Sequence, residues 1–228
     1  MGHLTVLPPP PSHAAAPRRG PLAAKAAACD RCRACPLYHN ATQAVFGEGR
    51  VGAPIMLVGE QPGDVEDRAG RPFVGPAGKL LATLLADARV DKRDLYLTNA
   101  VKHFGFEQRG KHRLHKKPSM TDVVACRPWL QDEVTIVRPR VVVALGATAA
   151  AALFGPKVRL TRDRGQALDV PDVTVALGQT VKLVTYHPAA ALRAPTPEKR
   201  KELRQLLTRD LALASRLAGS AKSRAVHA

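Results

Sequence analysis

Residues 54–64 have the sequence PIMLVGEQPGD, in which a short apolar run leads into a turn with two glycines, a proline and two carboxylates. The apolar run is typical of a strand that is buried on both faces of a parallel sheet. Glycine lets a ligand approach the backbone closely, and proline fixes the shape of the turn. Ligands of open α/β sheets bind at the carboxyl edge, where such strands end. The stretch therefore predicts an α/β fold with an active site at this turn, and Glu60 is the first candidate for a catalytic carboxylate.

The pattern of an apolar strand followed by a helix recurs along the chain. Further strands are expected over residues 95–100, 140–146 and 181–186. Helices are expected over residues 77–88, 120–137 and 147–154, and from Thr196 onward. Ser119 and Asp122 have the spacing of a helix capping box, whereas residues 105–117 are polar, lack periodicity and are expected to form a loop. We predict a three-layer α/β/α fold around a central, mostly parallel, four-stranded sheet.

The 228 residues suffice for one domain of this class, which we expect over residues 29–217. Residues 1–28 contain four consecutive prolines, no acid and no apolar core of a signal peptide, so we expect a disordered basic tail. A flexible C-terminal tail is expected over residues 218–228. No apolar stretch is long enough to span a membrane. These features lead us to expect a cytoplasmic, monomeric protein without a membrane partner.

The chain carries 35 Lys and Arg against 19 Asp and Glu, a formal net charge of +16. A charge of this size predicts a polyanionic partner such as a nucleic acid. A genome that favours Ala and Arg codons would explain the Ala runs, but it would not explain the clustering of charge. Residues 105–117 hold five Lys or Arg and one acid, which fits contact with phosphates as well as a merely solvated basic loop.

The cysteines follow a metal-binding pattern. Cys29, Cys32 and Cys35 have the spacing C-x2-C-x2-C, and Cys126 stands far from them in the sequence. In a cytosolic protein such cysteines are more often metal ligands than disulfides, and thiolates bind iron–sulfur clusters and zinc. The four cysteines could be the complete ligand set, but His103 competes with them as a fourth ligand.

Four blocks of the chain together resemble the family 4 uracil-DNA glycosylases, which are iron–sulfur enzymes of the uracil-DNA glycosylase superfamily. The blocks are Cys32-x2-Cys35 with residues 45–49, GEQPGD with residues 70–78, LTNAVK at residues 97–102, and His187-Pro188. The resemblance covers roughly residues 30 to 217.

Three details resemble one branch of the family, UdgX, whose members become covalently attached to uracil-containing DNA. Gln61 follows Glu60, and His103 stands where ordinary members have a cysteine ligand. Residues 111–115, KHRLH, resemble the Lys-Arg-Arg-Ile-His signature of the branch but depart from it at His112 and Leu114.

The resemblance implies a [4Fe-4S] cluster and a set of functional residues. The implied cluster ligands are Cys32, Cys35, His103 and Cys126, with Cys29 as a spare thiol; the alternative is a ferredoxin-like set that includes Cys29. The implied catalytic residues are Glu60, His115 and His187. Contacts to a flipped-out uracil are implied for Gln61, Asp64, Phe73 and Asn99, and contacts to DNA for Lys111, Arg113, Lys116 and Arg193.

Glycosidic cleavage creates a cationic sugar and an anionic base, and each needs an oppositely charged or hydrogen-bonding partner. The resemblance implies that Glu60 lies beside the sugar, that His187 donates to the base, and that a neutral His115 attacks the sugar and stays attached. Two alternatives remain open. One is a conventional family 4 enzyme that turns over, and the other is a non-catalytic iron–sulfur module that binds nucleic acid. The expected partner is uracil-containing DNA in the cytoplasm of a bacterium.

Overall fold

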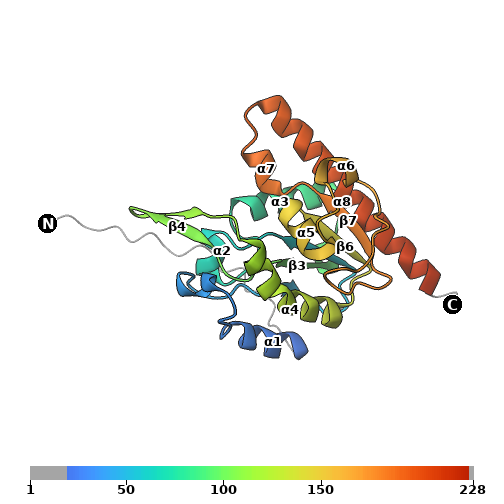
Figure 1. Ribbon diagram of the computed structural model, residues 1–228. Coiled ribbons are helices and arrows are strands. Elements are labelled where there is room, and N and C mark those ends of the chain that lie inside the picture. The colour runs from blue at the N-terminus through green and yellow to red at the C-terminus, as the bar shows by residue number, and fades with distance from the viewer. Residues whose placement is uncertain (1–19, 226–228) are drawn as a thin grey trace.

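The computed structural model describes the backbone of residues 20–225 and the side chains of residues 20–219 (Figure 1). The central sheet has the strand order β1-β3-β2-β6-β7. Its four parallel strands are β2 (Ile55–Gly59), β3 (Leu95–Asn99), β6 (Val141–Leu145) and β7 (Val181–Thr185). The expected three-layer, mostly parallel α/β fold is confirmed, but the sheet has five strands instead of four. The fifth, β1 (Glu48–Gly49), pairs antiparallel to β3 and is only two residues long, which is too short to leave a periodic pattern.

Helices cover both faces of the sheet (Figure 1). Alternate residues of a strand point to opposite faces, so they pack against different layers. Met56 and Val58 of β2 belong to a core shared with α1 (Pro21–Cys29), α4 (Met120–Val137) and α5 (Ala147–Phe154). Ile55 and Leu57 belong to the opposite core, shared with α3 (Pro76–Asp87), α7 (Pro188–Leu192) and α8 (Pro197–Ala225). The apolar run before the GEQPGD turn is therefore buried on both faces, as its sequence predicts.

The long periodic helices agree with the expectation. α4 begins after Ser119, whose hydroxyl accepts a hydrogen bond from the Asp122 nitrogen at 3.1 Å. The Asp122 carboxylate accepts one from the Ser119 nitrogen at 2.9 Å, which completes the predicted capping box. Several short elements lacked a sequence signal: α2 (Asp64–Ala69), α6 (Leu160–Asp163), α7, and the 3-10 turns Pro36–His39 and Lys92–Asp94.

The expectation of a loop over residues 105–117 is wrong. The segment forms an antiparallel hairpin of β4 (Phe106–Arg109) and β5 (His112–His115), in which Phe106 is paired with His115. Gly110 lies in the turn with φ of 56°, a conformation that glycine adopts without strain. The hairpin projects from the body of the domain beside α2 (Figure 1).

The edges of the domain also differ from the expectation. α1 begins at Pro21, inside the expected disordered tail, and Leu22 and Ala26 are buried in the core one helical turn apart. α8 continues past residue 217 to Ala225. The rest of the expected tails, residues 1–19 and 226–228, lies outside the described residues. Within the described part of the chain, no helix combines the length and the apolar character needed to cross a membrane.

Candidate active site

The carboxyl edge of the sheet brings the ends of three strands together. β2 ends at Gly59, which is paired with Asn99 at the end of β3, and β7 ends two residues before His187. Gly59 has no room for a side chain, because a Cβ atom there would lie 2.3 Å from Oδ1 of Asn99 and 2.8 Å from Cζ of Phe73. The Asn99 amide and the Phe73 ring therefore meet at Gly59. An aromatic face beside a side-chain amide suits a flat, polar ring as ligand.

Phe73 is held in an unusual backbone conformation, with φ of 56°. This left-handed conformation is unfavourable for a bulky residue, so the surrounding chain must impose it. Gly78 makes it possible, since a Cβ atom there would lie 1.8 Å from the carbonyl oxygen of Phe73. The buried carboxylate of Glu66 accepts a hydrogen bond from the Gly75 nitrogen at 2.7 Å and fixes the end of the turn. The Phe73 ring lies 6.3 Å from the imidazole of His187, centroid to centroid.

His187 caps the short helix α7 and is held in one tautomer. Its Nδ1 atom accepts a hydrogen bond from the Ala189 nitrogen at 3.1 Å. Because a main-chain N–H only donates, the proton of the neutral ring must be on Nε2. Burial lowers the pKa of His187 to about 4, with smaller contributions in the same direction from Arg193 and His115. The ring is therefore neutral at pH 7, and its Nε2–H is a hydrogen-bond donor.

His115 lies beside the turn that follows β2. Its Nε2 atom is 3.0 Å from Nε2 of Gln61 and 3.6 Å from Oε1 of Glu60. The Gln61 amide nitrogen also donates to the carbonyl oxygens of Gly105 at 3.1 Å and Lys116 at 2.9 Å. The Gln61 oxygen accepts from the Gly105 nitrogen at 3.2 Å, which fixes which end of the amide faces His115. The two hydrogens of this amide nitrogen are shared among the two carbonyl oxygens and His115, and the contact with His115 is a hydrogen bond only in the tautomer with a lone pair on Nε2.

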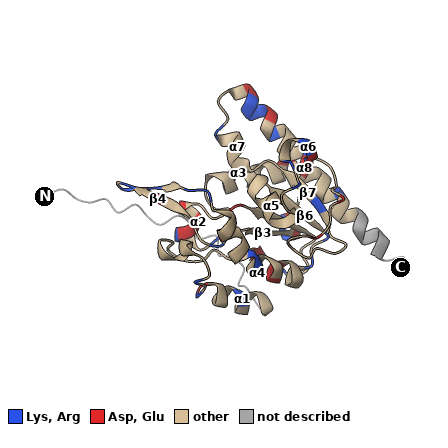
Figure 2. Cartoon of the chain, in the orientation of Figure 1, with Lys and Arg blue, Asp and Glu red and all other residues tan. Residues whose placement is uncertain are grey.

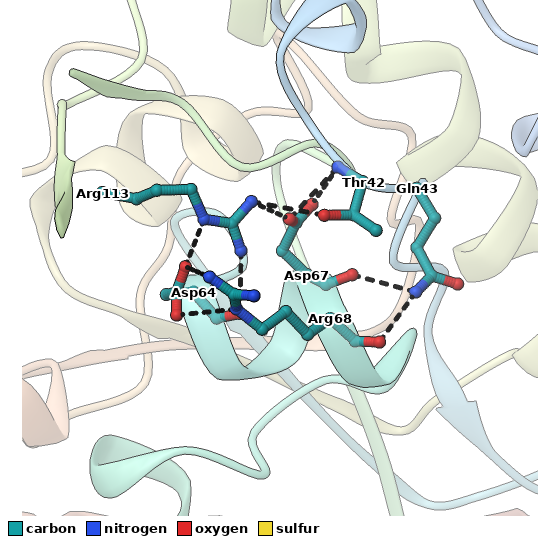
Figure 3. A network of polar contacts seen from close by, with 6 residues as sticks. All are labelled: Thr42, Gln43, Asp64, Asp67, Arg68 and Arg113. Atoms are coloured by element: carbon teal, nitrogen blue, oxygen red, sulfur yellow. Dashed lines mark hydrogen bonds and ion pairs between the residues drawn. The ribbon is translucent and has the colours of Figure 1, made fainter. Parts of the chain in front are cut away.

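A polar network holds the β4–β5 hairpin against α2 (Figure 3). Arg113 of β5 pairs through Nε with Asp64 and through Nη1 with the buried Asp67 at 2.7 Å. Asp67 also accepts hydrogen bonds from the Thr42 nitrogen at 3.0 and 3.1 Å. Arg113 and His115 are two residues apart on one strand and so face the same side of the hairpin. The network therefore fixes the strand that carries His115.

Arg113 and Asp64, expected at the DNA and at the base, are engaged in ion pairs within the fold. The Arg113 side chain is 11% exposed and already engages two carboxylates, so a DNA phosphate would have to displace one of them. Asp64, expected to shape the base pocket, pairs with Arg113 and with Arg68. The sequence holds no sign of the pairing of Arg113 with Asp64 and Asp67, because these partners come from segments far apart in the chain.

The other cations expected to contact DNA are exposed. They are Lys111 in the hairpin turn, Lys116 just beyond β5, and Arg193 at the end of α7. Figure 2 shows Lys and Arg gathered at the tip of the hairpin and along the first turns of α8. The hairpin carries His115 and α7 begins directly after His187, so these cations flank the residues at the carboxyl edge.

The cysteines come from two segments that the fold brings together. Cys29 ends α1 and is followed by Cys32 and Cys35, while Cys126 lies in α4, which packs against α1. Cys29, Cys35 and Cys126 are buried, and Cys32 is partly buried. Burial is the main reason that the pKa of Cys126 is raised to about 12; the charge of Lys102 acts in the opposite direction, and charge on Cys35 and Cys32 in the same direction. Burial also raises the pKa of Cys29, whose thiol interacts with Cys126 and Cys32.

The donor chemistry of this region suits an iron–sulfur centre. The sulfur of Cys126 accepts a hydrogen bond from the main-chain nitrogen of Lys102 at 3.2 Å. The sulfur of Cys32 accepts one from Nε1 of Trp129 at 3.3 Å. His103 is buried too, and burial, together with the charge of Arg33, lowers its pKa. The described part of the chain contains no group of three or more His, Cys, Asp or Glu side chains that are placed so that they could hold a metal ion.

A buried ion pair beside the site had not been anticipated. Lys102 and Glu133 are completely buried, and their charged atoms are 2.6 Å apart. A lysine directly after the apolar Ala100 and Val101 was a weak hint that its side chain turns inward. Nothing in the sequence identified Glu133, in the middle of α4, as its partner.

Comparison with known proteins gives a consistent result. Residues 46–212 match the family model of the uracil DNA glycosylase superfamily. The chain is 37% identical over 182 residues to the type-4 uracil-DNA glycosylase of Thermotoga maritima, which covers 79% of this chain and 86% of that protein. It is 38% identical over 183 residues to the type-4 uracil-DNA glycosylase of Pyrobaculum aerophilum, covering 80% of this chain and 87% of that protein. A type-5 uracil-DNA glycosylase of the same organism is 31% identical over 156 residues, covering 62% of this chain and 63% of that protein.

Proposed function

This chain belongs to the uracil-DNA glycosylase superfamily, and from that premise we propose that it excises uracil from DNA by cleaving the bond between C1′ of the sugar and N1 of the base. The observation that carries the proposal is the meeting of Asn99 and Phe73 at Gly59, with the His187 ring 6.3 Å from the Phe73 ring. A ring to stack on, an amide to read a polar edge and a neutral donor together fit a flipped-out uracil.

Each charge that develops during cleavage has a partner in this arrangement. The electrons of the breaking bond go to uracil, whose negative charge accepts hydrogen bonds from Nε2–H of His187 and from the Asn99 amide. The sugar becomes oxocarbenium-like, and the carboxylate of Glu60 stabilises its positive charge. These groups are held in place before the reaction, His187 by Ala189 and Asn99 by its strand, so little reorganisation is needed.

We further propose that His115 ends the reaction by capturing the sugar. The lone pair on Nε2 of His115 forms a bond to C1′ after uracil has left, and Glu60, 3.6 Å away, steers the cation toward it. The imidazolium then loses its Nδ1 proton to solvent, and the uracil anion takes a proton from water. A carbon–nitrogen bond to imidazole has no easy leaving route, so the protein remains attached to the DNA.

The competing proposal is a conventional enzyme that releases abasic DNA and turns over. It fits the names of the relatives, which are type-4 uracil-DNA glycosylases without mention of an adduct. In that case Glu60 would position or activate a water molecule, and His115 would contact the DNA backbone.

Excision itself is tested with an oligonucleotide that contains one uracil, by measuring free uracil and alkali-labile abasic sites. Release of uracil is expected from this strand, and no release from a matched strand with thymine. If no uracil is released under enzyme excess, the chain is not a glycosylase, and the non-catalytic binding module would be the remaining interpretation.

We propose that the buried cysteines hold a [4Fe-4S] cluster, with Cys32, Cys35 and Cys126 as three of its ligands. Such a cluster would cross-link α4 to the segment that follows α1. The fourth ligand is either His103, which the resemblance to UdgX favours, or Cys29, which interacts with Cys32 and Cys126. The exposed cations Lys111, Lys116 and Arg193 would contact the phosphates of the uracil-containing strand.

A further inference from the structure

The ion pair of Lys102 and Glu133 lies next to Asn99, the residue that we propose to hydrogen-bond the base. Both side chains are 0% exposed, and Nζ of Lys102 is 2.6 Å from Oε2 of Glu133. Removing two charges from water has a large desolvation cost, which their attraction repays only with good geometry and further hydrogen bonds. A buried pair of this kind is weak evidence for a role in stability, so its contacts decide what it does.

Lys102 folds back on the end of its own strand. Its ammonium donates to the main-chain oxygen of Asn99 at 2.8 Å and to the hydroxyl of Thr98 at 2.7 Å. The side chain thus closes the turn that leads away from β3, and it uses all three of its hydrogens on Asn99, Thr98 and Glu133. The backbone of Asn99 is held by a charge-assisted bond in addition to its sheet partner.

Glu133 ties this turn to the rigid helix α4. Its Oε1 accepts hydrogen bonds from the Gly47 nitrogen at 2.8 Å and from the Tyr96 hydroxyl at 3.1 Å. The Thr98 hydroxyl is 2.9 Å from Oε2. The carboxylate therefore joins α4, β3 and the segment before β1 through one buried group.

The same turn is bonded to the GEQPGD segment. The Ala100 nitrogen donates to the Gly59 oxygen at 2.9 Å, and the Val101 nitrogen donates to the Glu60 oxygen at 3.0 Å. The Asn99 amide lies so close to Gly59 that a small shift of this turn would move its hydrogen-bonding groups relative to Phe73 and the base. Recognition by a single amide depends on such sub-ångström placement.

We propose that Lys102, neutralised and held by Glu133, is the positioning residue that orients Asn99 for recognition of the base. The inference rests on the proposed function, because it takes Asn99 as the group that reads uracil. Lys102 does not touch the substrate. It acts by fixing the carbonyl of Asn99, and through it the direction of the amide.

The test separates recognition of the base from general binding of DNA. Two oligonucleotides are used, one with 2′-fluoro-2′-deoxyuridine, which resists cleavage, and one with an abasic tetrahydrofuran at the same position. The dissociation constant of the abasic strand divided by that of the fluorouridine strand reports the contribution of the base. In the Lys102→Met variant, we expect this ratio to fall by about tenfold, the loss of one hydrogen bond to a charged group, while binding to the abasic strand stays the same.

Two further variants distinguish a specific loss of base recognition from a general loss of folding. Lys102→Met with Glu133→Gln removes both charges and keeps an oxygen for the Gly47 nitrogen, so it should fold and still lose base recognition. Tyr96→Phe removes one hydrogen bond to the same buried carboxylate without touching the contact between Lys102 and Asn99. It is expected to keep the full base-dependent ratio.

Asn99→Ala provides the reference. If Asn99→Ala loses the ratio while both Lys102 variants keep it, the positioning role is overturned and the proposed function stands. If Tyr96→Phe loses the ratio as fully as Lys102→Met, the pair supports only the stability of the domain and the inference fails. If Asn99→Ala itself keeps the ratio, Asn99 does not recognise the base. The role proposed for Asn99 and the positioning role proposed for Lys102 are then both wrong.

Discussion

The Nε2 atom of His115 lies 3.0 Å from the Nε2 atom of Gln61, a contact in which the amide donates and the imidazole accepts. The hydrogen bond selects the tautomer with a lone pair on Nε2, which is the form that a nucleophile needs. It also occupies that lone pair, so in the proposed capture the ring must leave Gln61 before it can bond to C1′. Gln61 thus holds His115 in a ready but restrained position, and several predictions about the fate of the sugar depend on this pair.

Replacement of His115 by Ala is expected to abolish the covalent adduct and to leave uracil excision. In the proposed mechanism the leaving base is stabilised by Asn99 and His187 and the sugar cation by Glu60, so the first half of the reaction does not need His115. A denaturing gel and an assay for free uracil, run on the same samples, measure the two outcomes. His112→Ala, in the same strand but on its opposite face, is the matched control and should keep the adduct. A gel-shifted, denaturant-resistant band from His115→Ala would contradict the assignment.

Replacement of Gln61 by Ala is expected to slow adduct formation by about tenfold, since its hydrogen bonds to His115, Gly105 and Lys116, which place His115 and the base of the hairpin, are lost. Uracil release should slow less, because Asn99, Phe73 and His187 are unchanged. Single-turnover time courses of both products measure the difference. An equal loss in both steps would mean that Gln61 serves the excision step and not the placement of His115.

Replacement of Arg113 by Ala is expected to lower the free energy of unfolding by about 2 kcal/mol, because it leaves the buried Asp67 without its cation. The hairpin should become more sensitive to proteolysis and adduct formation slower. Lys111→Ala removes an exposed charge from the same hairpin and should change only the salt dependence of DNA binding. If Arg113→Ala has the stability of the parent and weakens DNA binding alone, Arg113 is a phosphate contact and not an anchor.

The stability of the protein is expected to depend on pH through His187. The pKa of this ring is about 4 in the folded protein against 6.5 for an unperturbed histidine. Between these values the unfolded chain takes up a proton that the folded chain does not, so the free energy of unfolding falls as the pH drops from 6.5 toward 4. Denaturant unfolding at several pH values, compared with His187→Gln, isolates the contribution. Parallel pH curves for the two proteins would contradict the assigned direction.

The fourth cluster ligand is decided by two substitutions. If His103 is the ligand, His103→Ala loses the visible absorbance and iron content of the purified protein, whereas Cys29→Ser keeps both. The opposite pattern would assign the site to Cys29, whose thiol interacts with Cys32 and Cys126 in the fold. Retention of iron in both variants would exclude either residue as an essential ligand.

The sequence predicts the parallel core of this fold well, because its elements are long and their apolar residues are regularly spaced. α4 and α5 begin and end where their patterns indicate, and the capping box of Ser119 forms as expected. The failures are elements with too few residues for a pattern. The two-residue β1 and the hairpin of residues 106–115 depend on pairing with another segment, which a local pattern does not contain.

The sequence points to single residues of the proposed site, but it does not show how they are connected. Glu60, Phe73, Asn99, His115 and His187 were each singled out in the sequence, and the fold brings them to one edge of the sheet. The pairing of Arg113 with Asp67 and of Lys102 with Glu133 could not be read from the sequence, because each joins segments more than 30 residues apart. These buried pairs orient the residues whose motifs are visible.

The most direct test of the account is the incubation of a stoichiometric amount of protein with a single-uracil oligonucleotide, followed by a denaturing gel and a measurement of free uracil. We predict one equivalent of uracil released per protein, together with one DNA band retarded by the mass of the protein. Several equivalents of uracil with free abasic DNA, and no retarded band, would contradict capture by His115 and establish conventional turnover.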